Sequence, residues 1–300
     1  GGTYNVEEGM LAGWVATSAT TSVTFDGTSG STHGPFNFLN FKCYGVTGHK
    51  YDDTDGSGTL GAGEPVIPGW GISLLKGDTV VATTTTNAQG VYSFEVCEAG
   101  SFTVREETRD GWRPTSPESA NYTGQSGTTQ NIDFFNFACY EVGITKFYDA
   151  NRDGIFAGPK ECALEGWSFD LSTNDGVALI VTTGADGHAT TELCGAGTIS
   201  VVEEDRPDWI HTTPASVSAV AASGVDHSFM FGNVKPFIGS LTIGYWKSHT
   251  GCPNDGTPVD AMFSASGVRC STEGLVGGPV TLGQGSAGAS VTVNNAAEAF

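Results

Sequence analysis

A segment with the sequence DTDGSGTLGAGE occupies residues 53–64 and carries oxygen-bearing side chains at regular intervals. It has Asp at positions 1 and 3, Ser at 5, Gly at 6 and Glu at 12, which is the ligand spacing of the calcium loop of an EF-hand. Carboxylate, hydroxyl and carbonyl oxygens are the ligands that Ca²⁺ prefers, and the glycine permits the sharp turn. The predicted ligands are Asp53, Asp55, Ser57, the carbonyl of Thr59, and Glu64.

A second segment, which begins at residue 149, repeats most of this pattern. Its positions 1, 3, 5 and 6 hold Asp, Asn, Asp and Gly, but position 12 is Lys160, because this loop is one residue longer. A glutamate follows directly and can still supply the last ligand. We therefore predict up to two structural Ca²⁺ ions, against the alternative that both segments are solvated acidic turns. The ligands of the second site would be Asp149, Asn151, Asp153, the carbonyl of Ile155, and Glu161.

The segments around the first loop predict strands rather than the two helices of an EF-hand. VTGHKY precedes the loop and PVIPGWGISLL follows it, and both favour extended structure. Gly, Thr, Ser and Val are abundant in the chain while Leu, Lys and Met are scarce, a mixture typical of many short strands. Calcium would therefore stiffen a loop between strands and move no helix.

The chain contains an internal repeat, marked by the blocks VEEGMLAGW, VREETRDGW and VVEEDRPDW. Each block leads through a Ser/Thr-rich stretch into an aromatic strand, and the tryptophans that end the blocks are 98 and 97 residues apart. A unit of about 100 residues with about seven short strands predicts an all-β fold of tandem Ig-like β-sandwiches. The predicted layout is the C-terminal half of a repeat (1–41), two complete repeats (42–138 and 139–235) and a distinct β-rich C-terminal segment (236–300).

The composition restricts the function classes. Lys and Arg total 13 against 33 Asp and Glu, which gives a net charge of −20 and disfavours binding to nucleic acid or to anionic membranes. No run approaches the ~20 apolar residues of a membrane span. Seven cysteines are typical of an exported protein, so we predict an extracellular location. The chain begins with GGTYNV, which predicts a processed product or a fragment.

Four of the cysteines occupy equivalent positions in the two complete repeats, 54 residues apart in one and 55 in the other. The simplest pairing is one disulfide within each repeat and a third in the C-terminal segment. Cys162 would then be free, paired between subunits or exchanged into another pair, and the alternative for all seven is reduced, buried thiols. The predicted disulfides are Cys43–Cys97, Cys139–Cys194 and Cys252–Cys270.

The order of these motifs resembles that of the B-type repeats of bacterial serine-aspartate-repeat adhesins and of the related collagen-adhesin B-type domains. The resemblance is carried by KYDDTDGSGTLGAGEPVIPGW, TTTTNAQGVYSF, GSFTVREETRDGW and DFFNF, and it covers residues 1–235. It implies extracellular prealbumin-like sandwiches that are strung as stalks on cell surfaces or in pili, many of them with calcium in such a loop.

The resemblance also implies a covalent bond. Collagen-adhesin-type domains can link a lysine on the first strand to an asparagine on the last, which needs a desolvated, neutral lysine and a buried carboxyl group that transfers protons. Serine-aspartate-type repeats generally lack this bond, and the alternative is a strand lysine whose head lies in solvent. Residues 1–41 have the acid and the amide, Glu8 and Asn40, without a lysine of their own. The matching positions in the complete repeats are Lys50, Glu106 and Asn136, and Lys146, Glu203 and Asn233.

No sequence motif indicates an enzyme. GQGSAG (residues 283–288) matches a nucleotide-binding glycine pattern, but it leads into the strand-like ASVTV rather than into a helix. The histidines do not recur across the repeats, as a shared catalytic role would require. Asn121 begins the sequence Asn-Tyr-Thr, an acceptor for N-glycosylation.

Residues 1–41 hold only the late strands of a repeat and would leave an exposed sheet edge and half a core. Either the chain is truncated, or another molecule supplies the missing strands, with GGPVTLGQGSAGASVTVNN in the C-terminal segment as a candidate donor. We therefore predict a calcium-stabilised stalk or pilus-like filament subunit that self-associates by β-strand complementation. The alternative is the stalk fragment of an adhesin, whose host or surface ligand the sequence does not name.

Overall fold

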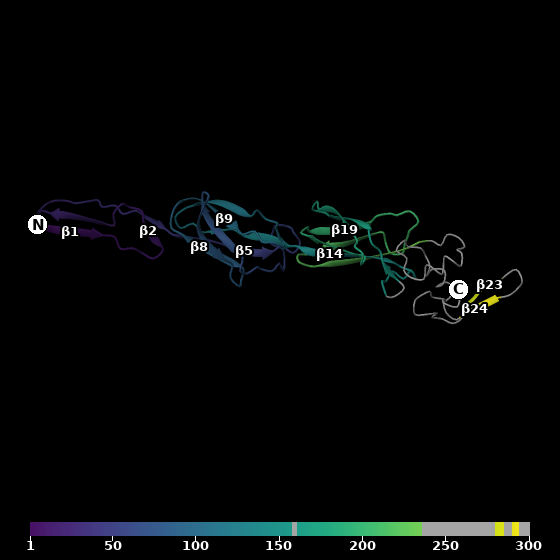
Figure 1. Cartoon of the computed structure of the whole chain (residues 1–300). Helices are drawn as coiled ribbons and strands as arrows, with labels where there is room; N and C mark the ends of the chain where they lie inside the picture. Colours follow the sequence, from purple (N-terminus) through teal and green to yellow (C-terminus); the bar gives the residue numbers. More distant parts are fainter. Residues whose placement is uncertain (158–160, 236–279, 285–289, 294–300) are drawn as a thin grey trace. The chain divides into compact units, whose positions relative to one another are not determined.

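Throughout the part of the chain that the structure describes, the regular secondary structure is β-strand, so the predicted all-β fold is confirmed (Figure 1). No helix in this part is long and apolar enough to cross a membrane. The chain divides into two compact units, residues 1–138 and 139–300. The computed structural model describes residues 1–157, 161–235, 280–284 and 290–293.

Repeat one, residues 42–138, is a sandwich of two sheets. Its strands alternate buried and exposed side chains, as in β8, where Tyr92, Phe94 and Val96 face the core, and this period of two buries one face of each sheet. The first sheet has the order β10-β13-β5-β12, with β8 also paired to β5, and consists of β5 (Tyr44–Asp52), β8 (Val91–Val96), β10 (Trp112–Pro114), β12 (Gln130–Asn131) and β13 (Phe134–Ala138). The second has the order β11-β9-β6-β7 and consists of β6 (Gly71–Lys76), β7 (Thr79–Thr85), β9 (Gly100–Glu106) and β11 (Ser119–Gly124).

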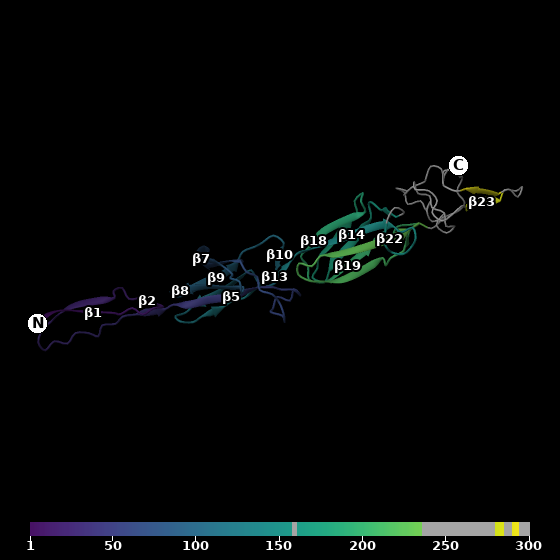
Figure 2. The ribbon, with the colours of Figure 1, turned by 90° about the horizontal axis from the view of Figure 1, so that it is seen from below.

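Repeat two, residues 139–235, is built in the same way, and Figure 2 shows its central strands β14, β22 and β19. Its core strands carry the same alternation, with Val142 and Ile144 of β14 buried, and the buried rings of Phe169 and Phe231 pack with their centroids 4.8 Å apart. The first sheet contains β14 (Tyr140–Tyr148), β15 (Cys162–Ala163), β18 (His188–Leu193), β20 (Ile210–His211) and β22 (His227–Val234). The second contains β16 (Ser168–Thr173), β17 (Ala178–Thr182), β19 (Gly197–Glu203) and β21 (Ser216–Ala221).

Two details of the strand prediction were wrong. Among the described residues, each repeat holds nine strands rather than about seven, because short pairings of two or three residues, such as β10 and β20, extend the sheets. The segment PVIPGWGISLL is a strand only from Gly71, and before it only Val66 forms an isolated bridge, to Tyr51. Pro65 and Pro68 lack the N–H group that strand pairing requires, which explains the late start.

The first and last strands of each repeat lie side by side and run parallel. In repeat one Lys50 of β5 lies opposite Phe134 of β13, and Asp52 lies opposite Asn136. The strands β14 and β22 of repeat two have the same register. Because parallel strands end at the same edge of a sheet, this pairing brings the lysine of the first strand close to the asparagine of the last.

Residues 1–41 form two short antiparallel ladders, in which β1 (Gly2–Glu7) pairs with β3 (Ser22–Gly27), and β2 (Trp14–Ala16) pairs with β4 (Asn40–Lys42). Phe41 and Val15 pack against the hydrophobic core of repeat one. Other large apolar side chains of this segment are exposed, namely Tyr4, Met10, Leu11, Trp14 and Leu39. The segment therefore has a buried end and an apolar surface.

In the C-terminal segment the structure describes one antiparallel pair, β23 (Val280–Gln284) with β24 (Ser290–Val293). Both strands belong to the stretch that the sequence favoured as a strand donor. Cys252 and Cys270, with the disulfide predicted between them, lie outside the described residues.

Candidate calcium loops and buried lysine sites

The first acidic loop leaves β5 and folds around the carboxylate of Asp53. This residue is fully buried, and its Oδ1 accepts a hydrogen bond from Ser57 N at 2.9 Å while its Oδ2 accepts one from Gly58 N at 2.7 Å. Gly58 has a φ of 72°, which favours glycine at this turn. Carboxylate oxygens of Asp53, Asp55 and Glu64 lie within 4.8 Å of one another, so three of the predicted ligands converge on one point.

The second acidic loop has the same construction. The buried Asp149 accepts hydrogen bonds from Asp153 N at 3.2 Å and from Gly154 N at 2.9 Å. Carboxylate oxygens of Asp149, Asp153 and Glu161 lie within 4.8 Å of one another. Glu161 also accepts a hydrogen bond from Ala157 N at 3.0 Å. The longer loop therefore brings Glu161 to the place that Glu64 takes in repeat one.

The remaining ligands that the sequence predicted bond within their loops. Ser57 Oγ donates to the carbonyl of Thr59 at 3.0 Å. In the second loop Asn151 Oδ1 accepts from Asp153 N at 2.9 Å, and Ile155 N donates to Asp153 Oδ1 at 2.8 Å. These short-range bonds hold the backbone of each loop in a tight turn around its first aspartate.

The electrostatics of both loops favour a cation. Burial raises the pKa of Glu64, and the neighbouring charges of Asp53 and Asp55 raise it further. The pKa of Glu161 is raised by burial and then by the charges of Asp149 and Asp153. At Asp53 burial acts to raise the pKa, but hydrogen bonds from Thr115 and from the loop backbone outweigh it and lower the pKa. Crowded carboxylates repel one another, and a bound divalent cation would relieve that repulsion.

A lysine of the first strand is fully buried in repeat one. Lys50 Nζ lies 2.7 Å from Glu106 Oε2, and neither side chain is more than 1% exposed. Asn136 is also buried, and it acts to lower the pKa of the Glu106 carboxyl group. The alternative of a lysine whose head lies in solvent does not describe this site.

Repeat two contains the same three groups. Lys146 Nζ lies 2.7 Å from Glu203 Oε1, and both side chains are fully buried. Asn233 Nδ2 donates a hydrogen bond of 2.6 Å to the same oxygen, Glu203 Oε1. One carboxylate oxygen therefore contacts both the amine of the lysine and the amide nitrogen of the asparagine.

Burial shifts the pKa values of Lys50, Glu106 and Lys146 toward the neutral forms of these groups. It lowers the pKa of Lys50 to about 8, against the opposing attraction of Glu106. It raises the pKa of Glu106 to about 7, although Lys50 acts to lower it. The pKa of Lys146 is likewise lowered by burial to about 8. An uncharged amine beside a protonated carboxyl group is therefore accessible near neutral pH, and that is the state in which an amine is nucleophilic.

Sequence reasoning missed the aromatic wall of these sites. The buried Trp70 ring lies between two cations, with Lys50 Nζ at 4.8 Å and the guanidinium carbon of Arg109 at 4.4 Å from its centroid. Trp167 lies in the same way, with Lys146 at 4.3 Å and Arg206 at 4.4 Å. The signal was present, since the Gly-Trp dipeptide and the arginine recur at equal offsets in both repeats. These rings separate the lysines from solvent.

The structure joins Cys43 to Cys97 and Cys139 to Cys194. Each bond ties the start of the first strand to the end of the strand that pairs with it. Cys162 is also disulfide-bonded, which favours the alternative in which it is exchanged into another pair.

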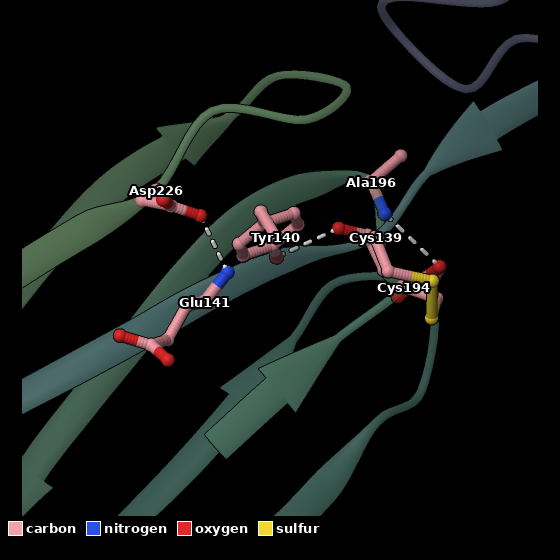
Figure 3. The surroundings of a disulfide bond; sticks show 8 residues. Cys139, Tyr140, Glu141, Cys194, Ala196 and Asp226 are labelled. Atoms are coloured by element: carbon pink, nitrogen blue, oxygen red, sulfur yellow. Dashed lines mark hydrogen bonds between the residues drawn. A yellow bond between two sulfur atoms is a disulfide. The ribbon is translucent and has the colours of Figure 1, made fainter. Parts of the chain in front are cut away.

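The neighbourhood of the Cys139–Cys194 bond is ordered by hydrogen bonds (Figure 3). Tyr140 Oη donates to the carbonyl of Gly195 at 2.8 Å, and Glu141 N donates to Asp226 Oδ1 at 2.7 Å. These contacts fix the entry of the first strand into repeat two.

In repeat one the glycosylation candidate Asn121 is exposed on β11, where its Oδ1 accepts a hydrogen bond from Thr103 Oγ1 at 2.6 Å.

Residues 1–41 bring together the acid and the amide without a buried lysine. Asn40 Nδ2 hydrogen-bonds to Glu8 Oε1. The pair lies at a hollow of about 180 Å³ whose lining is mainly apolar and consists of Glu8, Gly9, Met10, Leu11, Trp14 and Asn40. Two parts of the three-residue site are thus present at an open surface.

Tandem β-sandwiches with parallel first and last strands, internal disulfides and acidic loops make this chain resemble the B-repeat domains of bacterial surface proteins. Residues 46–136, within repeat one, match the SdrD B-like domain, as the motif order implied. The domains of this family are non-enzymatic and belong to bacterial cell-surface proteins, which agrees with the predicted location at the cell surface.

The chain is a distant homologue of the serine-aspartate repeat proteins. It is 30% identical over 161 residues to serine-aspartate repeat-containing protein F of Staphylococcus epidermidis, a match that covers 48% of this chain and 9% of that protein. It is 31% identical over 126 residues to the bone sialoprotein-binding protein of Staphylococcus aureus, covering 37% of this chain and 11% of that protein. The chain thus spans only about a tenth of the length of these relatives.

Solved structures of pilins also resemble the chain. The minor pilin GBS52 of Streptococcus agalactiae has 13% sequence identity and a TM-score of 0.29, with 66% of this chain and 99% of that chain covered. The shaft pilin SpaA from Lactobacillus rhamnosus GG has 16% identity and a TM-score of 0.28, with 66% and 100% covered.

Proposed function

We propose that this chain is part of an extracellular stalk whose β-sandwiches are fastened internally by lysine–asparagine isopeptide bonds and by calcium. The observation that carries the proposal is the burial, in each complete repeat, of a lysine, a glutamate and an asparagine from the first, middle and last strands. The desolvation of a buried ion pair can cost more free energy than the attraction between its two charges returns. A reaction that consumes the lysine charge explains why both repeats keep it.

The chemistry follows from the contacts in repeat two. A proton passes from Lys146 Nζ to Glu203 Oε1, 2.7 Å away, and leaves a neutral amine. The amine attacks the side-chain carbonyl carbon of Asn233, a new N–C bond forms, and the bond to Asn233 Nδ2 breaks. Nδ2 departs as ammonia with one proton from the lysine nitrogen, and Glu203 keeps the other. Oε1 contacts both nitrogens, so it is placed to transfer these protons.

Mass spectrometry of the purified chain tests this proposal. Each bond releases one ammonia and lowers the intact mass by about 17 Da, so two bonds lower it by about 34 Da. Peptide mapping should recover one branched peptide that links Lys50 to Asn136 and a second that links Lys146 to Asn233. The matched control is Lys76→Met, because Lys76 pairs with Glu98 at the surface and the variant should keep both losses of ammonia. A disulfide-reduced chain whose intact mass shows no loss of ammonia would overturn the proposal.

Calcium is the second part of the proposal, and it is supported by the two clusters of three carboxylates. In repeat one Asp53, Asp55 and Glu64 would hold the ion, and in repeat two Asp149, Asp153 and Glu161 would hold it. These are hard oxygen donors that suit Ca²⁺. Bound calcium would neutralise each loop and fix it against the strands. Isothermal titration calorimetry with Ca²⁺ should find about two binding sites per chain. A titration that releases no heat, together with unchanged stability in EGTA, would contradict the calcium proposal.

Self-association is the third part, and it is supported by the open surface of residues 1–41. An apolar strand from another copy, with GGPVTLGQGSAGASVTVNN as the candidate donor, would cover Trp14 and Leu11 beside the pair of Glu8 and Asn40. Negative-stain electron microscopy in millimolar calcium and then in EGTA tests it. Ordered filaments that loosen in EGTA are expected. Monomeric particles under both conditions would contradict a filament and favour the stalk of an adhesin.

A further inference from the structure

The buried acid of repeat two has a neighbour that connects it to solvent. His211 of β20 lies with Nδ1 3.2 Å from Glu203 Oε2 and with Nε2 2.9 Å from Asp205 Oδ1. The exposure rises along this row, from 0% for the Glu203 side chain to 26% for His211 and 94% for Asp205. A single imidazole thus spans the distance from a buried carboxyl group to water.

Repeat one has no equivalent row. The strand position that pairs with the reactive asparagine is Pro114 in repeat one and His211 in repeat two. The position two residues after the buried acid is Thr108 in repeat one and Asp205 in repeat two. Neither proline nor threonine has a side chain that gains or loses a proton near neutral pH. The two repeats therefore share the reacting groups and differ in the residues on the solvent side of the buried acid.

We propose that His211, oriented by Asp205, is a proton relay between Glu203 and solvent that sets the rate and the pH dependence of bond formation between Lys146 and Asn233. This inference rests on the isopeptide reaction proposed above. His211 touches neither the amine nor the amide, so it acts through Glu203 as a positioning residue.

The proton balance of the reaction gives the relay its task. The lysine begins protonated and the acid ionised, and when ammonia has left, Glu203 holds one proton more than at the start. Oε1 faces the reacting nitrogens, while Oε2 faces His211, so the two oxygens of one carboxyl group serve two directions. After ammonia has left, the proton held on Oε1 exchanges to Oε2 within the same carboxyl group. Nδ1 of a neutral imidazole then accepts it, and Nε2–H passes one proton to Asp205 or to water, which returns Glu203 to its ionised form.

Other charged groups lie near the row formed by Glu203, His211 and Asp205. Lys146 on β14 contacts Glu203 from the inner side. Arg206 is held by Glu204 and by the carbonyl of Gly166. Lys235, at the end of the last strand, lies over the Trp209 ring with Nζ 5.2 Å from its centroid. Within the described residues, the groups that contact the imidazole nitrogens are therefore the two carboxylates.

The test follows both bonds in one molecule. The full chain, recovered unfolded before either bond has formed, is diluted into refolding buffers at a series of pH values on both sides of neutrality. Timed peptide mapping gives separate rates for the Lys50–Asn136 and Lys146–Asn233 bonds, so repeat one is the internal control. His211→Gln should slow the second bond by roughly tenfold to a hundredfold and change its pH profile, while the first bond keeps its rate. Asp205→Asn, at an exposed side chain, should slow the second bond by less.

The reciprocal variant strengthens the test, because it adds the relay to the other repeat. Thr108→Asp with Pro114→His should speed the Lys50–Asn136 bond and give it the pH profile of repeat two. An unchanged rate and pH profile of the second bond in both His211→Gln and Asp205→Asn would overturn the relay while leaving the isopeptide proposal intact. Absence of the Lys146–Asn233 peptide from the wild-type chain would overturn both.

Discussion

Repeats one and two share every group that the proposed reaction consumes and differ in the surroundings of those groups. Both bury a lysine and a glutamate 2.7 Å apart, and both place a tryptophan ring against the lysine. They differ in the length of the acidic loop and in the residue behind the acid, Pro114 or His211. The comparison teaches that the buried lysine, acid and amide set the chemistry, while solvent-side residues are free to set its rate.

The largest effect should come from removing the reactive lysine of one repeat. Lys50→Met should abolish the bond to Asn136 and leave Glu106 buried without its partner, which costs about 3–5 kcal/mol. Calorimetry should show one unfolding transition shifted down and the other unchanged. Lys146→Met should give the mirror image. If either variant lowered both transitions equally, the repeats would not be independent units, and the comparison between them would fail.

The disulfides should have the next largest effect. Cys43→Ser with Cys97→Ser opens a loop of 54 residues in repeat one, and the chain-entropy account gives a loss of about 4 kcal/mol. The double variant Cys139→Ser with Cys194→Ser should lose a similar amount in repeat two. Denaturant unfolding of wild type and variants measures both. A loss of stability in one repeat alone would show that the two disulfides, despite their equivalent positions, do not stabilise their repeats equally.

Calcium removal should have a smaller effect that distinguishes the two loops. With the ion at 100 times its Kd, binding contributes about 2.7 kcal/mol, and Asp53→Asn should remove this in repeat one alone. Asp149→Asn should do so in repeat two. In Ca²⁺, proteolysis of each variant should then cut only the altered loop, and in EGTA it should cut both loops. Loops that resist the protease in EGTA as well as they do in Ca²⁺ would contradict a calcium role.

The smallest effect to resolve is the pH profile of the bond in repeat one. The reactive state needs Lys50 neutral and Glu106 protonated. The pKa of Lys50, lowered to about 8, means that the amine gains its proton and the rate falls as the pH drops below that value. The pKa of Glu106, raised to about 7, means that the acid loses its proton and the rate falls as the pH rises above it. The timed peptide mapping should therefore find a bell-shaped profile with its maximum between pH 7 and 8.

Sequence patterns predicted those parts of the molecule that depend on local spacing. The loop of Asp53 and Glu64, the period-2 strand around Tyr92 and the equal cysteine intervals could all be read from short segments. The parallel pairing of β5 with β13 could not be predicted in this way, because the two strands lie at opposite ends of a repeat and the sequence of neither strand identifies its partner. The contact of His211 with Glu203 is of the same kind, since it depends on how β20 and β19 come together across the sandwich.

The position of the proposed bond has a mechanical consequence. The chain enters repeat two along β14 and leaves it after β22, and Lys146 and Asn233 lie at the edge where these parallel strands end. With the bond formed, tension applied to the two ends of the repeat passes through residues 139–146, crosses to Asn233 and leaves through residues 233–235. Residues 147–232 carry none of it. Most of the repeat, with its acidic loop, is then shielded from extension, and a pulled chain cannot lengthen there without breaking a covalent bond.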